Sequence, residues 1–136
     1  MRLCLCLLVA AVACLAGDPQ TTVTLHGKLI VSEGKPPAIE TTDHKTVLLD
    51  GDSQMKKVLA DTRLNGFEIQ ARGHFTAPDR FLLDPIHTRS MLVNQNGHLK
   101  MVTYWCDVCS IRAYTPGPCV CCQRETVLDL QDPDKL

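Results

Sequence analysis

Residues 66–75 read Gly-Phe-Glu-Ile-Gln-Ala-Arg-Gly-His-Phe, and they show the clearest alternation in the chain. Phe67, Ile69, Ala71 and every second residue after them are apolar or small, whereas the residues between them are charged or polar. Successive side chains of a β-strand point to opposite faces, so this pattern predicts a long strand with one buried face. The pair Asn65-Gly66 before it is typical of a helix end.

The segments that precede this strand predict three more strands and one helix. Residues 22–32 alternate in the same way and predict a first strand, which a glycine and two prolines end. Residues 38–42 and 45–50 then indicate a hairpin. Asp52 or Ser53 can cap a helix whose apolar side chains recur at three- and four-residue spacing. That predicted stripe consists of Met55, Val58, Leu59 and Leu64.

The segments that follow it predict shorter strands. Residues 80–84 indicate a short strand, and residues 90–93 and 98–105 indicate a hairpin whose turn is Asn96-Gly97. From Cys106 onward we expect a loop-rich, cysteine-containing segment. A last short strand is expected at residues 126–130, before an acidic end.

The predicted order of strand, two-stranded hairpin, helix, strand and strand resembles the OB-fold, a five-stranded Greek-key barrel. This resemblance covers about residues 22–85. The runs 23–75 and 104–123 are also similar to an uncharacterised family of small exported bacterial proteins, a resemblance that implies an architecture and no chemistry. We therefore expect a mainly β protein that contains an OB-like barrel with one helix, a β-hairpin and a zinc-ribbon-like tail. The expected boundaries are 18–89 for the barrel, 90–130 for the hairpin and cysteine-rich segment, and 131–136 for a disordered tail.

The composition excludes several functional classes. The chain has 136 residues, of which 45% are hydrophobic and 21% charged, as is usual for a globular protein. Its formal net charge of -1 creates no field that would attract nucleic acid or anionic lipid. With three Phe, two Tyr and one Trp there are few rings on which bases could stack. We expect no nucleic-acid partner and, because no catalytic motif is present, no enzyme.

The first residues resemble an export signal. Residues 3–15 carry no charge and follow Arg2, and this run is shorter than the about 20 residues that a membrane-spanning helix needs. Small residues suited to a peptidase follow at Ala16 and Gly17, so residues 1–17 are expected to be a signal peptide. As an alternative, residues 11–14 resemble a bacterial lipoprotein motif, which would place a lipid anchor on Cys14. Either reading predicts a periplasmic or cell-envelope protein without a transmembrane helix.

The cysteine cluster is the main candidate site. Its spacing is C-x2-C-x9-C-x-C-C, which contains two C-x2-C pairs. Such pairs are typical of zinc ribbons, because each tight turn places two sulfurs about 2.3 Å from a tetrahedral ion. Four thiolates leave no open coordination position, so the zinc would be structural. The expected ligands are Cys106, Cys109, Cys119 and Cys122, with Cys121 as the alternate ligand.

Two other uses of the cluster remain open. Exported proteins usually form disulfides, although a structural zinc contributes an apparent free energy of about 10–16 kcal/mol to folding against about 3 kcal/mol for a fifteen-residue disulfide loop. An iron-sulfur centre, a copper site or a redox dithiol is the other use. We therefore expect a non-catalytic exported module that binds zinc and also a protein or a small ligand. An envelope thiol-disulfide redox or copper-handling protein is the alternative.

The histidines carry a weaker signal. His26, His44, His74 and His98 fall on polar strand faces or in turns, where solvent exposure is expected. His87 and Arg89 precede the hairpin that leads to the cysteines. The absence of a functional role is the first expectation for both, and an approach to the outer coordination sphere of the metal, or a small anion site, is the alternative.

Overall fold

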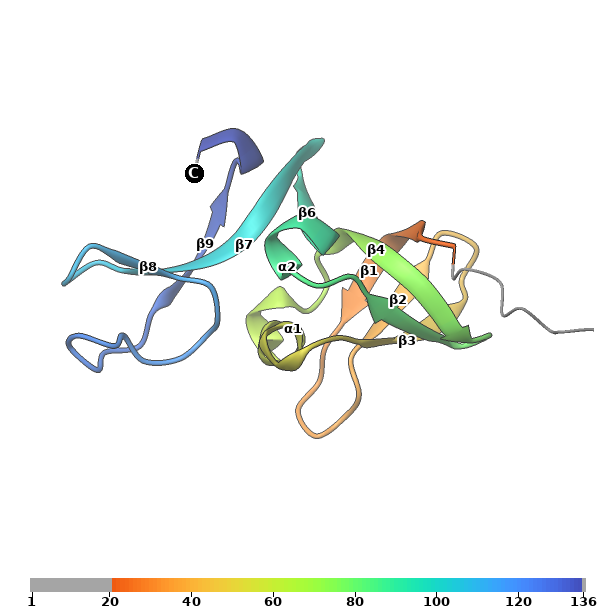
Figure 1. Cartoon of the computed structure of the whole chain (residues 1–136), viewed down its shortest axis with the longest axis horizontal. Coiled ribbons are helices and arrows are strands. Elements are labelled where there is room, and N and C mark those ends of the chain that lie inside the picture. Colours follow the sequence, from red (N-terminus) through yellow and green to blue (C-terminus); the bar gives the residue numbers. More distant parts are fainter. Residues whose placement is uncertain (1–20, 136) are drawn as a thin grey trace, which may run out of the picture.

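The computed structural model describes residues 21–135 and contains every strand that the sequence predicts (Figure 1). The predicted signal peptide and Cys14 lie outside the described residues. The elements are β1 (Val23–Ile30), β2 (Ala38–Thr41), β3 (Thr46–Asp50), α1 (Ser53–Leu59), a 3-10 helix (Thr62–Leu64), β4 (Glu68–Ala77), β5 (Arg80–Leu83), α2 (His87–Ser90), β6 (Met91–Gln95), β7 (His98–Cys106), β8 (Ile111–Ala113), β9 (Val127–Gln131) and a 3-10 helix (Pro133–Lys135).

Strands β1 to β5 form a closed barrel. β1 pairs with both β2 and β4, β2 pairs with β3, and β4 pairs with β5, all antiparallel. β3 and β5 run parallel, with Leu48 opposite Arg80, and this pairing closes the barrel. Helix α1 lies between β3 and β4 in the chain. This strand order and helix position are those of the OB-fold, so the predicted fold class is confirmed.

The alternation of β4 places Ile69 and Ala71 in the core, where both side chains are at most 2% exposed. The prediction that this buried face extends to Phe75 is wrong, because Phe75 is 43% exposed. The register between β4 and β5 shifts between Phe75 and Ala77, and this irregularity turns the end of β4 away from the core. The Phe75 ring instead packs edge-on against Phe81, with centroids 5.1 Å apart.

Glycines allow the strands of the barrel to approach each other closely. A Cβ atom on Gly27 would lie 2.1 Å from the Glu40 carbonyl oxygen, and one on Gly73 would lie 2.1 Å from that of Leu82. Any side chain at either position would therefore force two paired strands apart. Gly27 and Gly73 of the alternating patterns are therefore sites of close backbone contact.

Helix α1 begins as predicted and ends earlier. The Asp52 side chain accepts a hydrogen bond from the Met55 N–H at 2.8 Å, which makes Asp52 the N-cap. The predicted stripe is split, because Met55, Val58 and Leu59 belong to α1 and Leu64 belongs to the following 3-10 helix. Asp61 is the N-cap of this 3-10 helix, because its side chain accepts a hydrogen bond from the Arg63 N–H.

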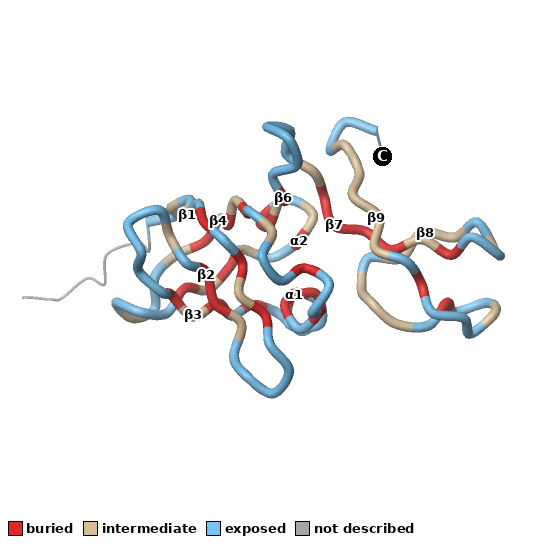
Figure 2. Tube along the Cα trace, turned by 180° about the vertical axis from the view of Figure 1, so that it is seen from behind, coloured by how far each residue is buried: buried red, intermediate tan, exposed pale blue. Residues whose placement is uncertain are grey.

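The predicted hairpin shares the core of the barrel. β6 pairs with β4, and four residues of β6 and β7 join the barrel's hydrophobic cluster. Figure 2 shows the buried stretch along β7. These four residues are Met91, Val93, Val102 and Tyr104. The short helix α2 before the hairpin was not predicted, and it begins after Ile86, which has a φ of 70°.

The tail is built on β7, which extends beyond the barrel (Figure 1). β8 and β9 both pair with β7 around Tyr104 and Trp105, so they lie along its two opposite edges. The sequence predicted a loop where β8 forms. It also predicted disorder over residues 131–136, but Gln131 ends β9, a 3-10 helix follows and Asp132 forms an ion pair with Lys100. Within residues 21–135 no helix is long and apolar enough to cross a membrane.

Candidate metal centre

Two similar turns position the cysteines. Cys106 is the last residue of β7 and Cys109 lies in the turn to β8, whereas Cys119 and Cys122 lie in the turn that precedes β9. In both turns the residue after the second cysteine has a positive φ, 53° at Ser110 and 61° at Gln123. The left-handed residue ends each turn and directs the chain away, so that both thiols of a pair face the same side.

Backbone N–H groups point at the sulfurs of both turns. The Cys109 N–H lies 3.5 Å from the Cys106 Sγ, and the Cys121 N–H lies 3.4 Å from the Cys119 Sγ. The second turn is also closed by backbone hydrogen bonds, from Cys119 N to the Arg124 carbonyl at 2.7 Å and from Gln123 N to the Cys119 carbonyl at 2.9 Å. These donors stabilise negative charge on the sulfurs and hold them in place.

The four predicted ligands lie together. The Sγ atoms of Cys106, Cys109, Cys119 and Cys122 all lie within 4.8 Å of one another, and those of Cys106 and Cys122 are 3.5 Å apart. Ligands 2.3 Å from a tetrahedral ion are separated by about 3.8 Å, so the group needs little adjustment to hold one. Cys106 and Cys119 are buried and the other two are partly buried. This cluster can therefore hold a metal ion.

Local contacts lower the pKa of one thiol of the cluster and raise the pKa values of two others. The N–H groups of Cys122 and Cys121 lower the pKa of Cys119 to about 7. For Cys106, the Cys109 N–H lowers the pKa, but burial and the neighbouring Cys122 thiol together raise it above its ordinary value. The thiols of Cys121 and Cys122 raise the pKa of Cys109. Neighbouring thiolates repel each other, and a bound cation would remove this obstacle to their ionisation.

Cys121 occupies a different environment. It is exposed and is not a member of the group of four, although its thiol influences Cys109. All five cysteines of residues 21–135 are free thiols in the structure. The arrangement is one compact group of four sulfurs with a fifth thiol at its edge.

His87, whose alternative predicted role was in the outer coordination sphere of the metal, is not a member of the group of four. His87 is buried, and its Nε2 donates a hydrogen bond to the Val102 carbonyl at 3.2 Å. Val102 precedes Cys106 by four residues on β7, a distance of about 13 Å along a strand. Burial lowers the pKa of His87, and the hydrogen bond to Val102 only partly offsets this effect. The buried His87 ring thus links α2 to β7, while Arg89 is exposed.

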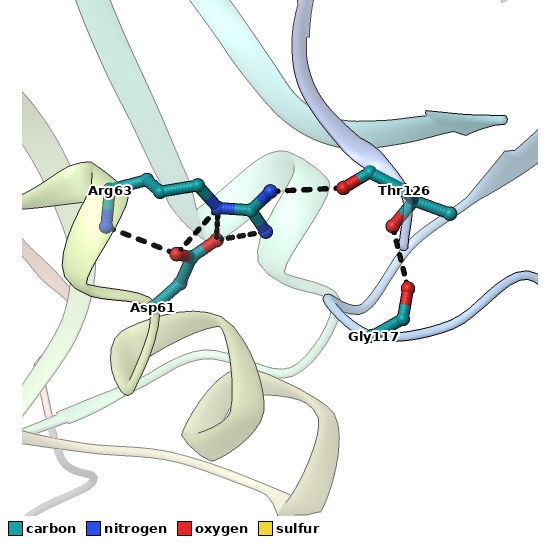
Figure 3. A network of polar contacts seen from close by, with 4 residues as sticks. All are labelled: Asp61, Arg63, Gly117 and Thr126. Carbon is teal, nitrogen blue, oxygen red and sulfur yellow. Dashed lines mark hydrogen bonds and ion pairs between the residues drawn. The ribbon is translucent and has the colours of Figure 1, made fainter. Parts of the chain in front are cut away.

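A polar network that the sequence did not predict joins the tail to the barrel (Figure 3). The Arg63 guanidinium binds both Asp61 carboxylate oxygens, at 2.9–3.1 Å, and donates to the Thr126 carbonyl at 3.0 Å. The Thr126 hydroxyl in turn donates to the Gly117 carbonyl at 2.8 Å. Burial opposes the ionisation of Asp61, but the hydrogen bonds from Arg63 outweigh it and lower the pKa of that carboxyl.

Two arginines that bind residues of the tail also lie over aromatic rings of β7. The Arg63 guanidinium lies 5.3 Å from the centre of the Tyr104 ring, and Arg112 lies equally far from the Trp105 ring. Arg112 also binds Asp129 of β9 at 2.7 Å. A lone arginine in a short 3-10 helix has no sequence pattern that identifies its distant partner, so only the fold could reveal the role of Arg63.

The comparisons with known proteins identify no relative. No family model, no curated protein and no solved structure matches the chain.

Proposed function

We propose that this chain is an exported, non-catalytic module in which a structural zinc ion holds the tail and the barrel binds a ligand. The observation that carries the zinc proposal is the approach of the four sulfurs within 4.8 Å. An all-thiolate set suits Zn²⁺ and closes its coordination sphere, so the ion would stabilise the fold and activate no water. The residues that would hold it are Cys106, Cys109, Cys119 and Cys122.

The position of the cluster supports a structural role. The two turns follow β7 and precede β9, and the partly buried tail strands around them contribute few side chains to the main core. A bound ion would connect the two turns where apolar packing is scarce, and its binding free energy would then contribute to the folding of the tail.

The proposed location rests on the sequence. The uncharged run after Arg2 supports export with removal of residues 1–17, and a lipid on Cys14 remains the alternative. The intact mass of exported protein tests both. A chain that starts near Asp18 supports the signal peptide, a diacylated chain that starts at Cys14 supports the lipoprotein, and a chain that retains Met1 contradicts export.

Metal analysis together with thiol counting tests the zinc proposal. Protein recovered from its native compartment is expected to contain one zinc per chain that resists mild chelation, and to release four additional reactive thiols when a strong chelator removes the ion. A metal-free protein with two disulfides would contradict the proposal.

The exposed fifth thiol favours a second candidate function, that of a copper-handling or thiol-disulfide redox protein. Cys121 lies beside Cys109 at the surface of the cluster, where it can meet a partner. Copper(I) prefers thiolates, and exchange between neighbouring thiols would permit its transfer. Reversible oxidation of the cluster, or copper(I) capture that displaces zinc, would support this candidate over the structural zinc.

A further inference from the structure

The barrel carries a hollow of about 630 Å³ beside α1. Three parts of the chain line it: the β1–β2 loop, the end of β3 with the C-terminal half of α1, and the residues at the β4–β5 turn. Figure 1 shows the β1–β2 loop extending beside α1. The volume lies within the range of about 300–1,000 Å³ that is usual for small-molecule sites. No residue after Arg80 lines it in the described chain, so it is separate from the cysteine cluster.

Most of the wall is apolar and aliphatic. Val31, Leu49 and Leu59 form buried parts of it, and the adjacent prolines 36 and 37 contribute further apolar surface. None of the lining side chains is aromatic. A nucleobase or a sugar ring would therefore find no stacking partner here. The wall is better matched to an aliphatic chain.

The rim carries unpaired positive charge. Lys35, Lys56 and Arg80 line the hollow together with two acidic residues, Glu33 and Asp50. Lys56 forms an ion pair with Asp50 at 3.4 Å. Within residues 21–135, neither Lys35 nor Arg80 has a carboxylate oxygen within 4 Å. Within the same residues Glu33 also has no cation within 4 Å, so three cations against two carboxylates leave the lining one net positive charge, which is complementary to one negative group on an apolar ligand.

We propose that this hollow binds a free aliphatic carboxylate of medium chain length. The chain would lie against the accessible surface of Pro36, Pro37 and Leu48, and the carboxylate would lie at Arg80 and Lys35. Arginine presents a planar pair of donors that matches the two oxygens of a carboxylate. The inference rests on the proposed ligand-binding role of the barrel and names the class of its ligand.

Calorimetric titration of the zinc-loaded mature chain with octanoate, decanoate and dodecanoate tests the apolar half of the site. Each methylene buried in the hollow should tighten binding about fourfold, which corresponds to about 0.8 kcal/mol. Each step of two methylenes is therefore expected to lower the dissociation constant about fifteenfold, at one ligand per chain. Dodecanol has the same chain without the charge and is expected to bind about tenfold more weakly than dodecanoate.

Two variants test the placement of the ligand. Arg80→Gln removes the cation at the rim and is expected to weaken dodecanoate about tenfold, whereas dodecanol should bind as it does to the parent protein. Arg89→Gln removes the same charge from an exposed arginine outside the hollow and should change neither affinity. Ala60→Phe places a ring on an exposed lining position and is expected to weaken both ligands at least tenfold.

Three results would overturn the proposal: no saturable binding, affinity that does not depend on chain length, or equal weakening by Arg80→Gln and Arg89→Gln. Zinc content, measured in the same samples, separates this outcome from failure of the metal proposal. Absent binding in protein that holds one zinc per chain overturns the ligand alone. Normal binding in protein without a metal site overturns the zinc alone.

Discussion

Arg63 joins two distant parts of the chain with one guanidinium group. It neutralises the buried Asp61 carboxylate and donates to the Thr126 carbonyl in the tail (Figure 3). Asp61 is 6% exposed at its side chain, whereas Arg63 is 40% exposed. Loss of the arginine would leave a desolvated carboxylate without its partner, which costs more than loss of an exposed ion pair.

Arg63→Met is therefore expected to lower the free energy of unfolding by about 2 kcal/mol, a value reduced for the solvent exposure of the arginine. Arg72→Met is the matched control, because Arg72 pairs with Asp84 across an exposed surface at 3.0 Å and its loss should cost less than about 1 kcal/mol. Urea denaturation of both variants gives the comparison. Equal losses would show that Arg63 is an ordinary surface residue.

His87 is expected to make stability depend on pH. Burial lowers the pKa of its imidazole below the ordinary value of about 6.5. As the pH falls through 6.5, the unfolded chain takes up a proton that the folded chain resists. The stabilisation is complete above the unfolded pKa and is lost as the pH falls toward the folded pKa.

Denaturant midpoints between pH 7.5 and 5 should consequently fall for the parent protein. His87→Gln retains a side-chain N–H for the Val102 carbonyl and should flatten this part of the profile. His98→Gln alters an exposed histidine and should leave the slope unchanged. A profile that His87→Gln does not alter would contradict the role of the buried imidazole.

At the scale of elements, the close pairing of β4 with β5 depends on Gly73. A Cβ atom there would lie 2.1 Å from the Leu82 carbonyl oxygen and 2.8 Å from the Leu83 Cα. Gly73→Ala is expected to destabilise the protein by about 3 kcal/mol, because the barrel strands must separate. Gly34→Ala, with a φ of 73° and no atom within 4 Å of the added Cβ, should cost only about 1 kcal/mol. Thermal unfolding of the two variants tests the difference.

The barrel elements were predictable because each carries a local signal. Alternation identified the strands, and Asp52 identified the start of α1. Strand pairing was also implied by the resemblance to the OB-fold. The errors lie where tertiary contacts override local pattern. The shift after Phe75 depends on the register with β5, and α2 begins at a left-handed Ile86 that has no turn signature.

In the candidate site, too, the sequence predicted the features that have a local pattern and missed those that depend on tertiary contacts. Two C-x2-C pairs at ribbon spacing identified the four sulfurs that the fold brings together. The partner of His87 could not be predicted, because Val102 offers only a backbone carbonyl from fifteen residues away. The hollow beside α1 also has no sequence signature, since its lining comes from segments of the chain that meet only in the closed barrel.

At the scale of the whole molecule, the tail and the barrel share β7 but differ in what holds them. Val102 and Tyr104 belong to the main core, whereas the turns after Cys106 depend on the proposed metal. Removal of zinc by a strong chelator should therefore speed hydrogen exchange at least tenfold for the amides of Cys119 and Thr126. Amides in the β1–β4 ladder should keep their protection. Equal loss in both regions would contradict this division.

The most direct test of the central claim is the zinc content of the mature protein and of its five single Cys→Ser variants, measured after the same purification. We expect one zinc in the parent and in Cys121→Ser. Serine at Cys106, Cys109, Cys119 or Cys122 should lower the zinc content or weaken its retention against a chelator at least tenfold, because a neutral hydroxyl replaces a thiolate. Loss of zinc in Cys121→Ser with retention in Cys119→Ser or Cys122→Ser would change the ligand set. Absence of zinc from the parent, or a zinc content that no substitution alters, would contradict the metal centre itself.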